Sequence, residues 1–108
     1  MLSQIDIVRQ ALLSVTDNVF HYHGLKGTYP YVMWAEDSEY DSVEADNRKV
    51  NQTVEGTIDL FTKEENDALV DEIQGALCEY CISFRLNTVA YEEETEVIHW
   101  EWVWQVGI

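Results

Sequence analysis

The chain has 108 residues, of which 46% are hydrophobic and 12% aromatic, enough to build the core of one domain and to argue against disorder. Its 21 acidic and 6 basic residues give a formal net charge of −15, which argues against a nucleic-acid-binding domain and against an anionic membrane surface, since both need cations. No apolar run is long enough to span a bilayer and no signal peptide begins the chain, so we expect a soluble, intracellularly made protein.

The N-terminal third predicts one helix and one strand. Apolar residues at helical spacing predict an amphipathic helix over residues 3–16, with Ile5, Val8, Leu12 and Val15 on its buried side. Residues 19–22 fit neither pattern clearly. Pro30 then precedes a run of β-forming residues, and because proline is tolerated at the start of a strand, we expect a strand over residues 31–35.

The middle of the chain combines an acidic segment with a long alternating one. Residues 36–47 hold six acidic residues among twelve and show no apolar period, which predicts an exposed, mobile loop. Residues 50–61 alternate well, with Val50, Val54, Ile58 and Leu60 on one face, which predicts a long strand with one solvated face. Thr62 and Glu65 then have the spacing of a capping box, so we expect a second helix from Thr62 to about residue 79.

The last third predicts a hairpin of two strands joined by the acidic residues 92–96. In residues 82–91, simple alternation puts Leu86, Thr88 and Ala90 on one face and Val89 and Tyr91 on the other. In residues 97–106, Ile98, Trp100, Trp102, Trp104 and Val106 share a face, opposite His99 and Glu101. These tryptophans either fill the core beneath the helices or reach the rim of the sheet, where they would meet a neighbouring subunit.

Together these segments predict an α+β fold. The expected order is α-β-β-α-β-β, with an antiparallel sheet of about four strands and the two helices packed on one face. Neither a repeat nor a linker interrupts the sequence, so residues 1–108 are expected to form a single domain.

The sequence offers no clear catalytic or metal-binding constellation. Cys78 and Cys81 form a Cys-x-x-Cys pair at the end of the second predicted helix, where the helix dipole does not activate a thiol, so we interpret them as buried free thiols. His21, His23 and His99 could complete a zinc site in number but lack the spacing of a second ligand pair. No phosphate loop, nucleophile elbow or metalloprotease motif is present, so we expect a protein that is not an enzyme and has neither metal nor cofactor.

Three motifs in order resemble a known family. They are Tyr29-Pro30-Tyr31-Val32-Met33, Glu44-Ala45-Asp46-Asn47, and Gly56-Thr57-Ile58-Asp59-Leu60-Phe61-Thr62-Lys63, the last followed by a helix. Together they are similar to the tail-completion or tail-terminator proteins, also called head–tail joining proteins, of long-tailed bacteriophages and prophages. The resemblance implies a single tail-terminator-like domain and a structural role in the virion.

The resemblance also implies partners and a location. Such proteins form a ring, typically a hexamer, that caps the tail tube and meets the head connector, so the implied partners are further copies, the tail-tube protein and the head-connector protein. The implied location is the virion tail, after assembly in the host bacterial cytoplasm. We expect DNA to pass the ring lumen without specific binding, because the chain is acidic, and no membrane contact is expected.

Contacts are expected at the acidic segment, the strand before it and the tryptophan strand. A ring in which each subunit offers two different patches needs such separate surfaces. The candidate contact residues are Tyr31, Met33, Trp34, Glu36, Asp37, Glu39, Asp41, Glu44, Asp46, Trp100, Trp102 and Trp104. The alternative function left open is an acidic DNA mimic or inhibitor that binds a basic partner, which would require carboxylates spaced on a rigid scaffold.

Overall fold

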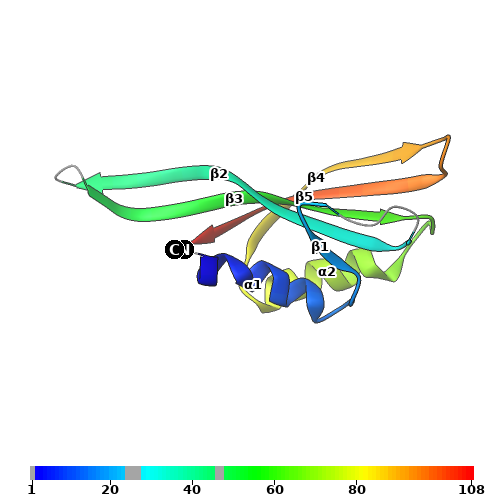
Figure 1. The fold of residues 1–108 in the computed structure, drawn as a ribbon, viewed down its shortest axis with the longest axis horizontal. Coiled ribbons are helices and arrows are strands. Elements are labelled where there is room, and N and C mark those ends of the chain that lie inside the picture. The colour runs from blue at the N-terminus through cyan, green and yellow to red at the C-terminus, as the bar shows by residue number, and fades with distance from the viewer. Residues whose placement is uncertain (1, 24–27, 46–47) are drawn as a thin grey trace.

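The computed structural model describes the backbone of residues 2–23, 28–45 and 48–108, and the side chains of these residues except 2, 3, 40–45 and 48–51. The chain forms α1 (Leu2–Leu13), β1 (Val19–His21), β2 (Tyr31–Ala45), β3 (Arg48–Thr62), α2 (Ala68–Glu79), β4 (Ser83–Glu92) and β5 (Val97–Gly107). Both helices lie on the same face of one sheet (Figure 1). Neither helix, at 12 residues, is long and apolar enough to cross a membrane, among the residues described.

The sheet has five strands in the order β1-β2-β3-β5-β4 and is mixed, so the expected antiparallel sheet of about four strands is wrong. The difference is β1, which pairs with β2 in parallel from Val19↔Val32 to His21↔Trp34. Its three residues are too few to show a period, so apolar patterning does not predict this strand. The Asn18 side chain fixes the returning chain by donating to the carbonyls of Thr28 at 2.9 Å and Pro30 at 2.8 Å. The observed order is therefore α-β-β-β-α-β-β.

The acidic segment is a strand rather than the predicted loop. β2 continues through Ala45 and pairs antiparallel with β3 as far as Ala45↔Arg48, with register shifts after Glu36, Glu39 and Val43. Strand pairing satisfies the backbone whatever the side chains are, so a strand exposed to water needs no apolar period. Since β5 pairs with β3 only from Thr53 onward, residues 41–45 and 48–52 form a two-stranded arm beyond the sheet (Figure 1).

The core lies between the two helices and the central strands. The buried stripe of α1 (Ile5, Val8, Ala11, Leu12) and that of α2 (Leu69, Ile73, Ala76, Leu77) cover Ile58 and Leu60 of β3 and the indoles of Trp102 and Trp104 of β5, both fully buried. Each buried indole removes up to about 250 Å² from water, worth several kcal/mol at roughly 25 cal/mol per Å². The tryptophan strand therefore supplies the centre of the core.

Gly56 of β3 makes room for one of these indoles. A Cβ on Gly56 would lie 2.1 Å from the Ala35 carbonyl oxygen of β2 and 2.4 Å from the Trp104 ring. The Trp104 ring therefore packs directly on the glycine backbone, and its Nε1–H donates to the Thr57 carbonyl at 3.0 Å. Trp102 donates likewise to the Gln74 side chain of α2 at 3.0 Å. Both buried indole N–H groups are thus satisfied, as buried polar groups require.

Helix α2 begins later than its predicted capping box. Its first helical residue is Ala68, and Asp67 is the N-cap, accepting from the Leu69 N–H at 2.9 Å. Thr62 instead ends β3, and its buried hydroxyl donates to the Asp67 carboxylate. The expected helix start at Thr62 is therefore wrong. Asp67 caps the helix instead, and the Thr62 hydroxyl at the end of β3 holds the Asp67 side chain in place.

Strand β4 contains an irregularity that simple alternation does not show. Its register against β5 shifts at Asn87, between Leu86↔Trp102 and Thr88↔Glu101, so that Val89 pairs with Trp100 and Tyr91 with Ile98. Leu86, Val89 and Tyr91 therefore share the helix-covered face, whereas alternation had placed Val89 and Tyr91 opposite Leu86. The cysteine prediction also fails, since Cys78 and Cys81 are free but exposed.

Candidate functional site

The face of the sheet away from the helices, here called the open face, carries most of the charged groups of the sheet. Alternation along β3 and β5 brings Glu55, Asp59 and Glu101 to this face, opposite the buried Ile58, Leu60 and Trp102. Asp37 of β2 joins them. Burial and the charges of Asp59, Glu55 and Glu36 raise the pKa of the Asp37 carboxyl, so this face holds carboxylates close enough to repel one another.

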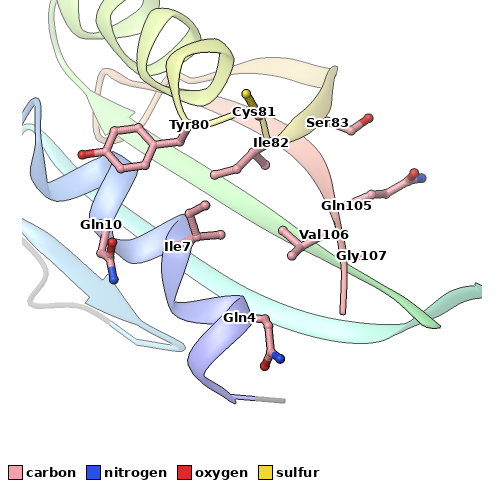
Figure 2. Close-up of a pocket in the computed structure, with 10 residues that line it drawn as sticks. All are labelled: Gln4, Ile7, Gln10, Tyr80, Cys81, Ile82, Ser83, Gln105, Val106 and Gly107. Atoms are coloured by element: carbon pink, nitrogen blue, oxygen red, sulfur yellow. The ribbon is translucent and has the colours of Figure 1, made fainter. Parts of the chain in front are cut away.

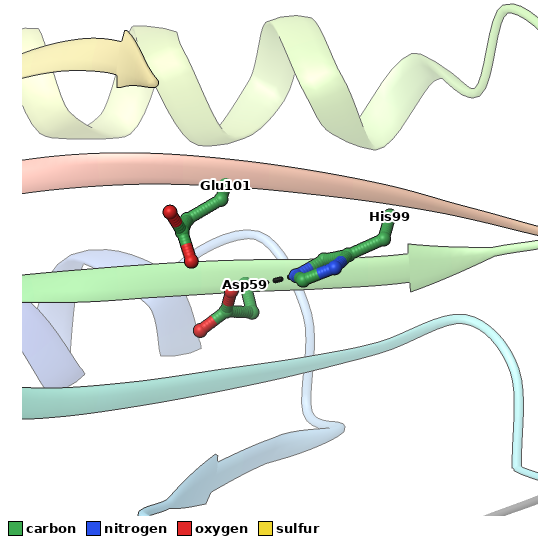
Figure 3. A group of neighbouring side chains, drawn as sticks. All are labelled: Asp59, His99 and Glu101. Carbon is green, nitrogen blue, oxygen red and sulfur yellow. Dashed lines mark hydrogen bonds and ion pairs between the residues drawn. The ribbon is translucent and has the colours of Figure 1, made fainter. Parts of the chain in front are cut away.

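His99 relieves part of this repulsion (Figure 3). Asp59 and Glu101 are direct cross-strand partners, a placement that is unfavourable for like charges. The His99 Nε2 atom lies 2.6 Å from Asp59 Oδ1, and the hydrogen bond with Asp59 raises the pKa of His99 despite partial burial. When it is protonated, the imidazole of His99 is therefore a positive charge among these carboxylates.

These three side chains are also the described group whose ligand atoms could meet at one metal ion. Their candidate atoms all lie within 4.8 Å of one another. A histidine with two carboxylates suits a divalent ion such as Zn²⁺. However, the short His99–Asp59 contact already satisfies both groups, so their arrangement is explained by an ion pair.

A row of stacked rings runs across the open face beside this pair. Phe61 of β3 stacks on His99 with ring centroids 4.3 Å apart and on Tyr31 of β2 at 4.8 Å. Phe20 of β1 meets Tyr31 edge to face at 6.2 Å. The row therefore links β1 to β5 and fixes the orientation of the His99 ring. Sequence reasoning had placed His99 on this polar face but did not identify its partner.

A second histidine–carboxylate pair lies between β1 and β2, at one edge of the sheet. His21 Nε2 of β1 lies 2.7 Å from Glu36 Oε1 of β2, and the His21 ring stacks on Trp34 at 4.0 Å and on Tyr22 at 4.2 Å. Burial tends to raise the pKa of Glu36, but hydrogen bonds from Tyr22 and His21 lower it overall. Glu36 Oε2 is buried and has no hydrogen-bond partner among the described residues, whereas Oε1 contacts His21.

The residues predicted as contacts are distributed between core and surface. Four of them are buried: Tyr31, Trp34, Trp102 and Trp104. Three are half-buried, namely Met33, Glu36 and Trp100, and two are exposed, namely Asp37 and Glu39. Asp41 and Glu44 lie on the arm, where side chains are not described, and Asp46 lies outside the described residues. Of the three tryptophans on β5, Trp102 and Trp104 are therefore core residues, and Trp100 is half-buried and packs against the same core.

The exposed large apolar residues lie elsewhere, at the two edges of the sheet. Among the described residues they are Leu13, Tyr22, Leu86, Val89 and Tyr91. The last three are on β4, which forms one edge, whereas Tyr22 directly follows β1, which forms the other. Sequence reasoning missed both groups. The shift at Asn87 is what exposes Val89 and Tyr91 beside Leu86, and apolar alternation alone does not reveal it.

A cleft of about 620 Å³ opens between α1, the α2–β4 connection and the end of β5 (Figure 2). The ten described residues that line it include no histidine, carboxylate or basic side chain: Gln4, Ile7, Gln10, Tyr80, Cys81, Ile82, Ser83, Gln105, Val106 and Gly107. It also lies away from the Asp59–His99 pair, which occupies the open face. Its lining therefore consists of apolar, amide and hydroxyl groups together with the phenol of Tyr80 and the thiol of Cys81.

No protein-family model and no curated protein sequence matches the chain. Among solved structures, the fold is similar to that of a chain described as "Virion of native gene transfer agent (GTA) particle". The TM-score is 0.61 and the sequence identity 13%, and the match covers 92% of this chain and 89% of that one. The chain therefore shares its fold, over most of both chains, with a chain of a gene transfer agent virion.

Proposed function

We propose that this chain is a structural protein of a phage or prophage particle that caps the tail tube as a ring and joins it to the head connector. The observation that carries the proposal is the fold shared with a gene transfer agent virion chain over nearly the full length of both chains. The order of the Tyr29-Pro30-Tyr31, Asp46-Asn47 and Asp59-Leu60-Phe61-Thr62-Lys63 motifs adds the resemblance to tail terminators. The proposed location is the virion tail, after assembly in the host bacterial cytoplasm.

Two physical features support a ring. A closed ring built from one kind of subunit needs two different contact patches on each copy, and the exposed apolar residues of this chain lie at two different edges of the sheet. The acidic balance, with Asp37, Glu55, Asp59 and Glu101 on the open face, suits a lumen through which DNA passes without being held.

The proposed role is structural rather than catalytic. It needs no cofactor or metal, and its partners are further copies of the chain, in a ring of the hexameric kind, together with the tail-tube and head-connector proteins.

One observation favours a second function, that of an acidic DNA mimic. Such a protein needs carboxylates on a rigid scaffold, and the open-face carboxylates stand on paired strands of the sheet rather than on loops. This function predicts a stable complex with a basic DNA-binding protein and no self-assembly.

Light scattering tests the proposal. The mass of the purified protein would be measured at low and high salt, with and without the tail-tube protein of the same particle. We expect a discrete ring, alone or only on the tube, and more assembly at high salt because salt screens repulsion between subunits of charge −15. A monomer that ignores tube protein in every buffer would contradict the proposal and favour the DNA mimic.

A further inference from the structure

Strand β4 is an open edge with an apolar surface. It pairs with β5 on one side, and on the other no strand within the described part of the chain pairs with it. Leu86, Val89 and Tyr91 project from its helix-covered face and remain 44%, 48% and 60% exposed. A long edge strand with exposed apolar side chains readily pairs with another chain, and monomeric proteins usually avoid one.

The opposite edge carries the remaining large apolar residues that are exposed in the described chain. β1 is the outermost strand there, and Tyr22, which follows it, is 58% exposed. Leu13, at the end of α1, is 43% exposed, and a short connection joins it to β1. Exposed apolar side chains therefore stand on one edge strand, β4, and next to the other, β1, and the two sets consist of different residues.

The two edges stand at the same level along the strands. The register aligns Val19 of β1, through β2, β3 and β5, with Val89 of β4, and it aligns His21 with Leu86. β1 runs parallel to β2, and the three remaining pairings are antiparallel, so β1 and β4 point in opposite directions. If identical copies stand side by side, β4 of one therefore meets β1 of the next at equal height and antiparallel, the more stable pairing.

The charges of the two edges are complementary. The charged residues of β4 are Arg85 and Glu92. Arg85 of β4 pairs with Val103 of β5, Val103 pairs with Thr57 of β3, and Thr57 pairs with Ala35 of β2. Measured along the strands, Arg85 therefore lies close to the level of Glu36 and Asp37, which follow Ala35. A neighbouring copy would thus bring an exposed arginine towards an acidic edge. This matters because copies that each carry −15 repel one another elsewhere.

We propose that the partner of each edge is a second copy of this chain, with β4 of one subunit packing against β1 and the end of α1 of the next. The inference rests on the proposed ring function and names the surface that forms the ring. A second copy fits better than an unrelated protein because one chain carries both halves of the contact, at one level and in opposite strand directions. Repetition of such a head-to-tail contact is the kind of assembly that closes a ring when the rotation between neighbouring subunits divides a full turn.

Charged substitutions at the two edges test this contact. Val89→Glu places a carboxylate in the β4 patch, and Ala90→Glu is the matched control on the next residue, which is also exposed but pairs with His99 on the open face. Leu13→Glu alters the other edge. Each variant would first be checked for a wild-type circular dichroism spectrum. Under the conditions where the wild type assembles, we expect the ring to be lost in Val89→Glu and Leu13→Glu and kept in Ala90→Glu.

Mixing the two defective variants gives a second, independent readout. Val89→Glu retains an intact β1 edge and Leu13→Glu an intact β4 edge, so an equimolar mixture can form one sound contact per pair. We expect a heterodimer of twice the 12.6 kDa subunit mass that does not grow further. Assembly of Val89→Glu or Leu13→Glu like the wild type would overturn the edge contact while leaving the ring intact. A wild type that stays monomeric with tube protein would overturn both proposals.

Discussion

Replacing Gly56 by alanine should destabilise the fold strongly, because the added methyl group has no space. Its Cβ would lie 2.1 Å from the Ala35 carbonyl oxygen and 2.4 Å from the Trp104 ring, and the first of these atoms belongs to the backbone of a paired strand. Relief therefore requires β2 to move away or the buried indole to shift. Overpacking of this kind costs about 1–3 kcal/mol, and loss of the Trp104–Thr57 hydrogen bond adds about 1 kcal/mol.

Urea denaturation followed by circular dichroism measures this cost. With a slope of about 1.5 kcal/mol per M, a loss of about 3 kcal/mol lowers the unfolding midpoint by about 2 M. The matched control is Gly75→Ala in α2, where the added methyl group meets nothing within 4 Å. Because alanine is the better helix former, this control should gain about 0.5–1 kcal/mol. A Gly56→Ala midpoint equal to that of the wild type would refute the packing argument.

Three further changes test the charged and capping groups. His99→Gln should be less stable than the wild type, and this loss of stability should be largest near pH 6. It should shrink as the pH rises through the folded-state pKa of His99, which the Asp59 hydrogen bond raises. Denaturation at several pH values measures the loss, and a loss independent of pH would contradict the ion pair. Asp67→Ala should cost about 1 kcal/mol through loss of the N-cap, whereas Glu65→Ala should change the midpoint little; equal effects would instead favour the capping box. Asp37→Asn should raise the melting temperature at pH 7, because burial and neighbouring carboxylates led by Asp59 raise the pKa of this carboxyl, and the gain should vanish in acid, where the wild-type group is protonated.

Strong periodic signals in the sequence predicted the main elements well. The alternation of residues 97–106 placed the tryptophans and His99 on the correct faces of β5, and the helical spacing of residues 3–16 placed Ile5, Val8 and Leu12 on the buried side of α1. Both signals come from burial, which is what apolar periodicity records. β1 was not predicted because it has only three residues. The acidic half of β2 was not predicted as a strand because backbone pairing with β3 holds it, and such pairing requires no apolar period.

The candidate surfaces were harder to predict, because exposure depends on what covers a strand. The tryptophan strand was expected either to fill the core or to reach the rim, and it fills the core, with Trp102 and Trp104 buried and Trp100 half-buried against them. The role of the acidic residues on β2 as contacts stays a prediction. Val89 and Tyr91 are exposed beside Leu86 only because one residue, Asn87, shifts the register, and single-residue irregularities leave no periodic trace.

The two-stranded arm gives the molecule a long reach relative to its core. The whole fold measures 53 × 25 × 21 Å, and the five residues of each arm strand extend it by about 17 Å at 3.3 Å per residue. The arm joins the sheet where β2 shifts register after Glu36 and Glu39, and such bulges bend a strand. A hinge near these bulges would work as a lever, since a bend of about 10° there moves the tip by about 3 Å over this length. Small changes at the acidic bulges would therefore be amplified into large displacements at the far end.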